Sequence, residues 1–121
     1  MFFKFCKDMG DIRGFLKIKR KESEYRSVYE RVKYYKEVAL LCSDEITEQQ
    51  VYRGMDCSTP FCHWAYPLGN YIPKWNDLVF RKQWYKAYQL LSYTNTNNFP
   101  EITGRLCPAP CEYSCVLDIN D

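Results

Sequence analysis

The sequence predicts a small, mostly α-helical domain with long cysteine-bearing loops. With 121 residues, the chain is long enough for one modest core and too short for a nucleotide-binding domain beside it. Segments with apolar residues three and four positions apart predict short helices. Between them lie two turn-rich stretches, residues 57–73 and 97–115, which carry five of the seven cysteines.

The N-terminal third is expected to contain an extended segment and then two helices. Apolar and basic residues alternate over 15–21, which predicts a short extended segment with a solvated face. Residues 24–38 predict an amphipathic helix, with a core-packing stripe formed by Tyr25, Val28, Val32, Tyr35 and Val38. Ser43 is a good N-cap for a second helix that runs to about Met55.

The first cysteine-bearing loop spans residues 57–73, where prolines, Gly69 and Asn70 interrupt any regular element. Beyond it, the pattern over 75–91 predicts two short helices or one bent helix, and Pro73 suits the first turn. The aromatic residues of this pattern, Trp75, Trp84 and Tyr88, are expected in the core.

The second cysteine-bearing loop places Cys107, Cys111 and Cys115 four residues apart. Pro108 and Pro110 lack a backbone N–H, so the segment is expected to be a loop. Loops that return several thiolates to one point suit an iron-sulfur cluster or a zinc ion, although single cysteines are often simply buried. The odd cysteine count and the absence of a visible secretory signal predict a reducing cytoplasm, where clustered cysteines are more often metal-binding than disulfide-bonded.

Composition argues against several other classes of protein. There is no run of about 18 apolar residues, so no transmembrane span is expected. The net charge of +2 and one short basic run do not favour nucleic-acid binding. No G-x-G-x-x-G motif follows a strand pattern, so the chain is not expected to bind a dinucleotide by itself.

Two long segments carry a family resemblance: PFCHWAYPLGNYIPKWNDLVFRKQW and TNNFPEITGRLCPAPCEYSCVLDIND, with GDIRGFLKIKRKE near the start. They closely resemble the N-terminal iron-sulfur domain of the glutamate synthase (NADPH) small, or beta, subunit. More distantly, they resemble the N-terminal domain of dihydropyrimidine dehydrogenase.

The resemblance implies an alpha-helical ferredoxin-like domain with two [4Fe-4S] clusters that pass electrons between a flavin and a partner subunit. The implied partners are the glutamate synthase large subunit or the FAD and NADPH domains that follow in the family. Residues 9–121 would form this adaptor domain, truncated before those domains. Residues 1–8, with Cys6, would be an extension outside the family. The oxidoreductase chemistry would belong to the parent assembly, and the isolated chain is not expected to be catalytic.

The family's first ligand loop reads C-x2-C-x4-C-x3-C-P, which maps to positions 54, 57, 62 and 66. By the family's topology, one cluster would use positions 54, 57, 62 and 115, and the other 66, 107, 111 and a position beyond residue 121. Gly54 and Tyr66 supply no thiolate. The implied metal ligands are therefore Cys57, Cys62 and Cys115 for one [4Fe-4S] cluster, and Cys107 and Cys111 for a second, weaker site.

Three hypotheses follow for this ligand set. In the first, the chain is an electron-transfer adaptor whose first cluster keeps an open iron or recruits Asp56, His63 or Cys42. In the second, the domain is a cluster-free scaffold that docks a partner subunit. In the third, Cys57, Cys62 and two of the later three cysteines bind zinc.

Overall fold

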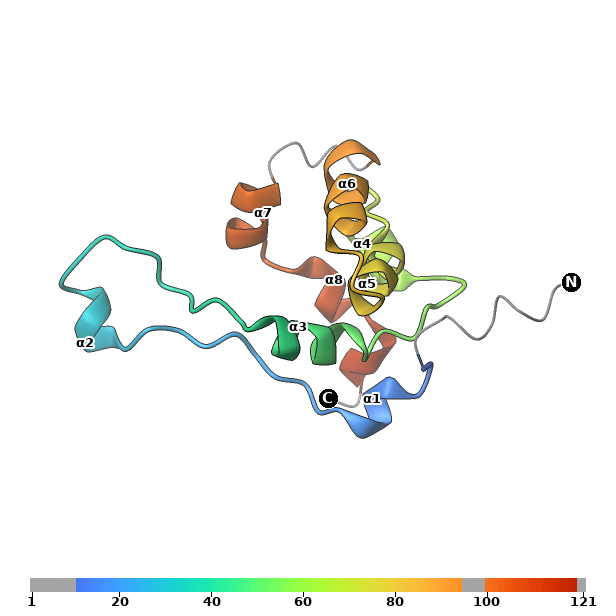
Figure 1. Cartoon of the computed structure of the whole chain (residues 1–121), viewed down its shortest axis with the longest axis horizontal. Coiled ribbons are helices and arrows are strands. Elements are labelled where there is room, and N and C mark those ends of the chain that lie inside the picture. The colour runs from blue at the N-terminus through green and yellow to red at the C-terminus, as the bar shows by residue number, and fades with distance from the viewer. Residues whose placement is uncertain (1–10, 95–99, 120–121) are drawn as a thin grey trace, which may run out of the picture.

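The structure is a computed structural model that describes residues 11–94 and 100–119. Within these residues the chain is helical and contains no strand, which confirms the mostly α prediction (Figure 1). No helix in this part of the chain is long and apolar enough to cross a membrane. The elements in order are α1 (Gly14–Lys17), α2 (Val28–Arg31), α3 (Asp44–Val51), α4 (Phe61–Ala65), α5 (Ile72–Phe80), α6 (Trp84–Thr94), α7 (Pro100–Leu106), α8 (Pro110–Tyr113) and the 3-10 helix η2 (Val116–Ile119).

The body of the molecule forms where α5 packs against α6 and α3, and where α4 packs against α8 and α5. Of the two alternatives for residues 75–91, the chain takes two helices, with Pro73 in the first turn of α5 as predicted. The α5 helix ends at Phe80. Two residues later, Lys82 has a left-handed φ of 59° and donates its N–H to the Val79 carbonyl at 2.8 Å.

The core of the described residues is thin: the buried ones are Gly14, Asn70, Ile72 and Ala87. The prediction that the aromatics of residues 75–91 fill the core is wrong for two of them. Trp84 is 39% exposed and Tyr88 is 51% exposed. With so little buried apolar surface, burial alone gives this domain limited stability.

Residues 18–43 leave the body as an extended arm with α2 at its tip (Figure 1). An antiparallel β-bridge between Tyr25 and Ala39 joins the two sides of the arm. Next to it, the Arg26 N–H donates a hydrogen bond to the Val38 carbonyl at 2.9 Å. The extended conformation predicted for residues 15–21 begins only at Ile18, because α1 takes the residues before it.

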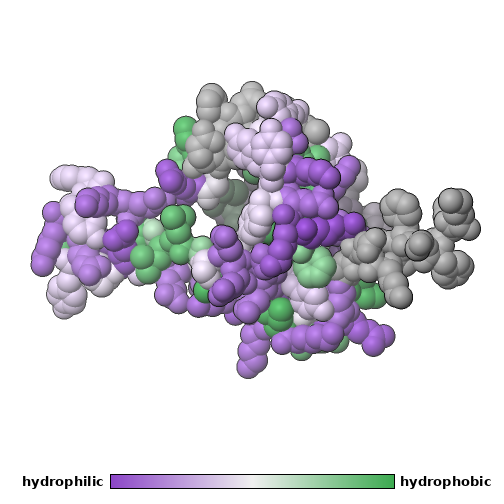
Figure 2. Space-filling view, viewed as in Figure 1, coloured by the Kyte–Doolittle hydropathy of each residue, from purple (hydrophilic) through white to green (hydrophobic). Residues whose placement is uncertain are grey.

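The amphipathic helix predicted over residues 24–38 is wrong, since only Val28–Arg31 is helical. Its apolar stripe is also not in the core: Val32 is 76% exposed and Tyr35 is fully exposed. Valine and tyrosine are weak helix formers, and a short amphipathic helix needs a surface to pack on. In Figure 2, apolar side chains lie at the surface where the arm joins the body, a segment in which Leu41 is also exposed.

The predicted start of the helix after Ser43 is confirmed, because Ser43 Oγ accepts a hydrogen bond from the Ile46 N–H at 3.3 Å. The helix ends at Val51, four residues before the predicted Met55. The next residue, Tyr52, contacts the Phe80 ring at a centroid distance of 5.3 Å. The α3 helix is thereby fixed against α5 just before the first cysteine-bearing loop.

Tyr52 also holds α1 to the body through Asp11. The Tyr52 hydroxyl donates a hydrogen bond to Asp11 Oδ2 at 3.0 Å, and Lys17 forms an ion pair with the same oxygen. The hydrogen bond from Lys17, with those from the Arg13 N–H and the Tyr52 hydroxyl, lowers the pKa of Asp11 from 3.8 to about 2.

We expect the Asp11 carboxyl carbon to titrate with a midpoint of about 2 in an NMR pH series. Because the folded pKa lies below the unfolded one, this carboxylate stabilises the fold above about pH 4, and the contribution is lost as the pH falls toward 2. Lys17→Met should move the midpoint up toward 3.8, whereas Lys21→Met should leave it unchanged. A wild-type midpoint near 3.8 would contradict the contacts described.

Candidate metal centre

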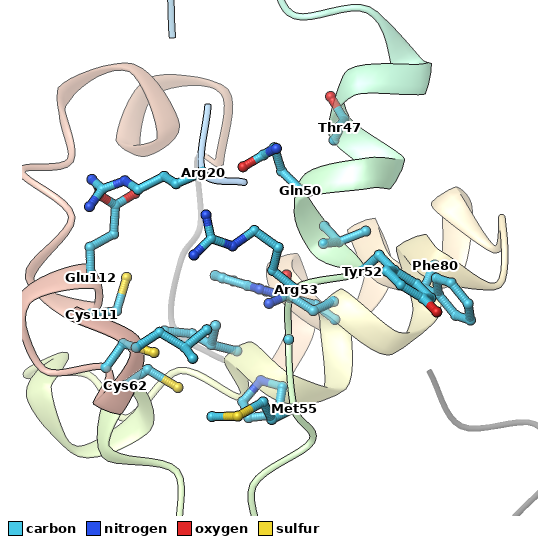
Figure 3. A pocket seen from close by; sticks show the side chains of 18 of the residues that line it. Arg20, Thr47, Gln50, Tyr52, Arg53, Met55, Cys62, Phe80, Cys111 and Glu112 are labelled. Carbon is cyan, nitrogen blue, oxygen red and sulfur yellow. The ribbon is translucent and has the colours of Figure 1, made fainter. Parts of the chain in front are cut away.

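The two cysteine-bearing stretches meet where α4 packs against α8. Cys62 lies in α4 and Cys111 in α8, while Cys57 precedes α4 and Cys115 follows α8. These four cysteines line one pocket of about 530 Å³. Figure 3 shows Cys62 and Cys111 together on one side of it. Cysteines 49 to 58 residues apart in the sequence therefore contribute thiols to a single cavity.

Cys62 lies at the centre of the first group of thiols. Burial raises the pKa of Cys62, and the nearby charges of Cys115 and Cys57 raise it further. Cys57 and Cys115 therefore each lie within electrostatic range of Cys62. These three cysteines are the ones that the family resemblance implies for the first cluster.

Cys111 links this first group to a second one. The pKa of Cys111 is raised by burial first, then by Glu112, and then by the charges of Cys107 and Cys62. The Glu112 carboxylate is itself held by Arg20, at 2.8 Å from Nη2. This ion pair joins the start of the arm to α8 at the rim of the pocket (Figure 3).

The second group contains a phenol where the family has a thiol. The pKa of Tyr66 is raised by burial, by the charge of Cys107, and by the hydrogen bond from the Tyr66 hydroxyl to that sulfur; the charge of Cys111 adds to the shift. Asn70, which is 1% exposed, also hydrogen-bonds the Tyr66 side chain. Tyr66 thus occupies the space beside Cys107 and Cys111.

The backbone of both loops takes a left-handed conformation next to the cysteines. Asp56 has a φ of 48° and immediately precedes Cys57; Ala109 has a φ of 50° and lies between Cys107 and Cys111. This conformation costs a non-glycine residue about 1–2 kcal/mol. It lets the Ala109 N–H donate to Cys107 Sγ at 3.4 Å.

The prediction that residues 107–115 form a loop is correct only in part. Cys107 and the two residues after it are irregular, but Pro110–Tyr113 form α8. Pro110 does not prevent this helix, because proline is tolerated in a first turn, where its missing N–H would have no partner.

The three suggested substitute ligands are placed differently in the structure. His63 Nδ1 donates to the Asn70 carbonyl at 2.8 Å, and its ring lies against Trp64 and Tyr71. It does not line the thiol pocket, whereas Cys42 and Asp56 do. The histidine is therefore a structural residue of the α4–α5 connection.

Gly54, the first departure from the family's ligand pattern, also lines the pocket. Its φ is not in the left-handed region. A Cβ atom built there would lie 3.2 Å from the Val51 carbonyl oxygen and 3.7 Å from Asn76 Nδ2. A small side chain at position 54 would thus fit after a slight shift, facing Asn76 of α5.

No three His, Cys, Asp or Glu side chains within residues 11–94 and 100–119 converge closely enough to bind one metal ion. A tetrahedral zinc site would hold its sulfurs about 3.8 Å apart, given Zn–S bonds of about 2.3 Å. A four-iron cluster spreads its thiolates more widely, because each binds a different iron. Three thiols around a pocket fit such a cluster, whereas two thiols and a neutral phenol in the second group do not.

Two features of this centre have no signal in the sequence: the buried Asn70 and the N–H of Ala109 directed at Cys107. In the sequence, Asn70 appeared only as a turn residue after Gly69, and Ala109 as a small residue between prolines. Cys6 lies outside the described residues, so its place relative to the site is not described.

Residues 31–121 match the protein family described as dihydropyrimidine dehydrogenase domain II, 4Fe-4S cluster. The chain is 52% identical over 113 residues to the glutamate synthase [NADPH] small chain of Mycobacterium tuberculosis H37Rv, covering 93% of this chain and 23% of that protein. It is 46% identical over 122 residues to the Bacillus subtilis small chain, covering 93% and 24%. Glutamate synthase [NADH] of Schizosaccharomyces pombe is 46% identical over 113 residues, covering 92% of this chain and 5% of that protein. The chain thus spans about a quarter or less of the length of these relatives.

Proposed function

The chain belongs to the dihydropyrimidine dehydrogenase domain II, 4Fe-4S cluster family, and from this premise we propose that it is a one-cluster electron-transfer domain of a glutamate synthase. The observation that carries the proposal is the group formed by Cys57, Cys62 and Cys115 around one pocket. We assign these three thiolates to a single [4Fe-4S] cluster. Residues 9–121 would form the adaptor domain.

When bound, an iron-sulfur cluster accepts and returns single electrons. The protein's part is to hold three irons by thiolates from two loops and to set the surroundings of the sulfurs. The packing of α4 against α8 fixes Cys62 relative to α8. The Arg20–Glu112 ion pair joins the arm to α8, and both residues line the pocket.

In this proposal the second group of side chains holds no cluster. Cys107 and Cys111 are two thiols where a cubane takes four protein ligands. The third position holds Tyr66, whose raised pKa keeps the phenol neutral and therefore a poor ligand for iron. The hydrogen bond of Tyr66 to Cys107 gives this phenol a structural role in the space of the lost cluster.

The proposed partners are the glutamate synthase large subunit and the FAD and NADPH domains. Two of the relatives are named glutamate synthase [NADPH] small chain, and this chain covers less than a quarter of the length of each. The arm supports a protein partner, since apolar residues on it are exposed and residues 18–43 carry seven basic and four acidic side chains. An acidic surface with apolar pockets would complement it.

Iron and acid-labile sulfide, measured with an absorption spectrum on protein purified without oxygen, test this assignment. We expect about four of each per chain and a broad band near about 400 nm. About eight of each would show that Tyr66 does not prevent a second cluster. A folded chain without metal would support the scaffold function instead, and one zinc per chain in colourless protein would support a zinc module.

A further inference from the structure

We propose that the cluster keeps one iron without a protein ligand beside Gly54, and that a low-molecular-weight thiol binds this iron as its fourth thiolate. The inference rests on the proposed function, because it needs the cluster held by Cys57, Cys62 and Cys115. It adds a binding site for an external ligand to a domain whose family resemblance implies only electron transfer.

The first argument is the space that Gly54 leaves in the pocket wall. The nearest atoms to a Cβ at this position are the Val51 carbonyl oxygen at 3.2 Å and Asn76 Nδ2 at 3.7 Å. Because the φ of Gly54 is not left-handed, the backbone does not require glycine here. Gly54 lines the pocket of about 530 Å³ and places no side chain in it.

The second argument is that two of the three protein substitutes are poorly placed to fill this space. His63 is held by the Asn70 carbonyl and faces another cavity. Cys42 precedes α3 while Gly54 follows it. The eight-residue helix, about 12 Å long, therefore separates the Cys42 thiol from position 54. Asp56 remains as the competitor, since its carboxylate lies on the same pocket.

The third argument concerns the chemical class of the ligand. Irons of a cluster are bound by sulfide and thiolate, and soft sulfur donors suit them better than carboxylates or water. On binding, the thiol releases its proton to solvent and its sulfur forms a bond to the open iron, with no change in electron count. The Asn76 amide lies beside this position and offers N–H donors to the bound sulfur.

The first experiment titrates 2-mercaptoethanol into the anaerobic, thiol-free holoprotein and follows the EPR spectrum of the reduced cluster. We expect a saturable change in the wild type, none in Gly54→Cys, and none with ethylene glycol, which has a hydroxyl in place of the thiol. Gly54→Ala adds the same Cβ atom without the sulfur. Its spectrum without thiol should match that of the wild type and differ from that of Gly54→Cys.

The second experiment treats the oxidised holoprotein with ferricyanide without added thiol. The wild type should lose about one iron in four, released as Fe²⁺ while ferricyanide takes one electron, and a three-iron EPR signal should appear. Gly54→Cys should keep its iron, and bound 2-mercaptoethanol should protect the wild type.

The outcomes separate this inference from the proposed function. If the wild-type cluster kept all its iron in ferricyanide and its EPR spectrum did not change on adding thiol, the inference would be overturned and the proposed function would stand. If Asp56→Asn then became sensitive, the carboxylate would be the fourth ligand. Wild-type protein that holds no cluster with or without thiol would overturn the proposed function together with the inference.

Discussion

Cys62→Ser is expected to remove nearly all iron and sulfide from the protein purified without oxygen, from about four of each per chain to a trace. Of the three proposed ligands, Cys62 is the one that lies near both of the others and near Cys111 as well. Its loss would leave two thiolates, in a site that already lacks one at Gly54. Metal analysis and the visible absorption spectrum measure the effect.

The same substitution should lower the unfolding midpoint by more than about 10 °C, because loss of the cluster would cost several kcal/mol. The thin core offers little stability in place of the cluster, because Ile72 and Ala87 are the buried apolar side chains of the described residues.

Cys42→Ser is the matched control, since Cys42 is exposed and lies at the far end of α3. It should retain the iron and the unfolding midpoint. If Cys62→Ser kept its iron, the assignment of this thiol would be wrong. If Cys42→Ser lost iron, Cys42 would be a ligand after all.

Gly14→Ala is expected to destabilise the domain by about 1–3 kcal/mol. Gly14 is the buried residue of α1. A Cβ atom there would lie 2.1 Å from the Tyr52 carbonyl oxygen and 2.6 Å from its Cδ1. The carbonyl belongs to the backbone at the end of α3 and cannot rotate away, so α1 must move. Chemical denaturation of the holoprotein measures the change.

Gly104→Ala makes the same chemical change in α7, where nothing lies within 4 Å of the added Cβ. It should stabilise the chain by about 0.5–1 kcal/mol, because alanine is the better helix former. Equal effects at the two positions would show that the close approach of α1 to Tyr52 is not required. A loosened α1 should also raise the pKa of Asp11 in Gly14→Ala.

The parts of the fold that the sequence predicted correctly depend on local signals. Ser43 caps α3 and Pro73 opens α5 because these preferences act within one helical turn. The arm was mispredicted because the periodicity of Tyr25, Val28 and Val32 says which side chains share a face. It does not say whether another surface covers that face.

For the candidate site, the family resemblance grouped Cys57 and Cys62 with Cys115, and Tyr66 with Cys107 and Cys111. The proximities in the structure agree with both groupings. The assignment of the cysteines as metal ligands remains a prediction. The sequence could not reveal the hydrogen bonding of His63 and Asn70, because that depends on how α4 turns back toward α5.

The contribution of Cys115 to the first group of thiols has a consequence for the order of protein synthesis. Cys57 and Cys62 are made 58 and 53 residues before Cys115. At about 5–20 residues per second, the ribosome needs roughly 3–12 s to make that interval. During this time the two early thiols belong to an incomplete nascent chain. Delivery of iron to the finished site must therefore follow translation of α8, and a chain interrupted before Cys115 would be released without its third thiolate.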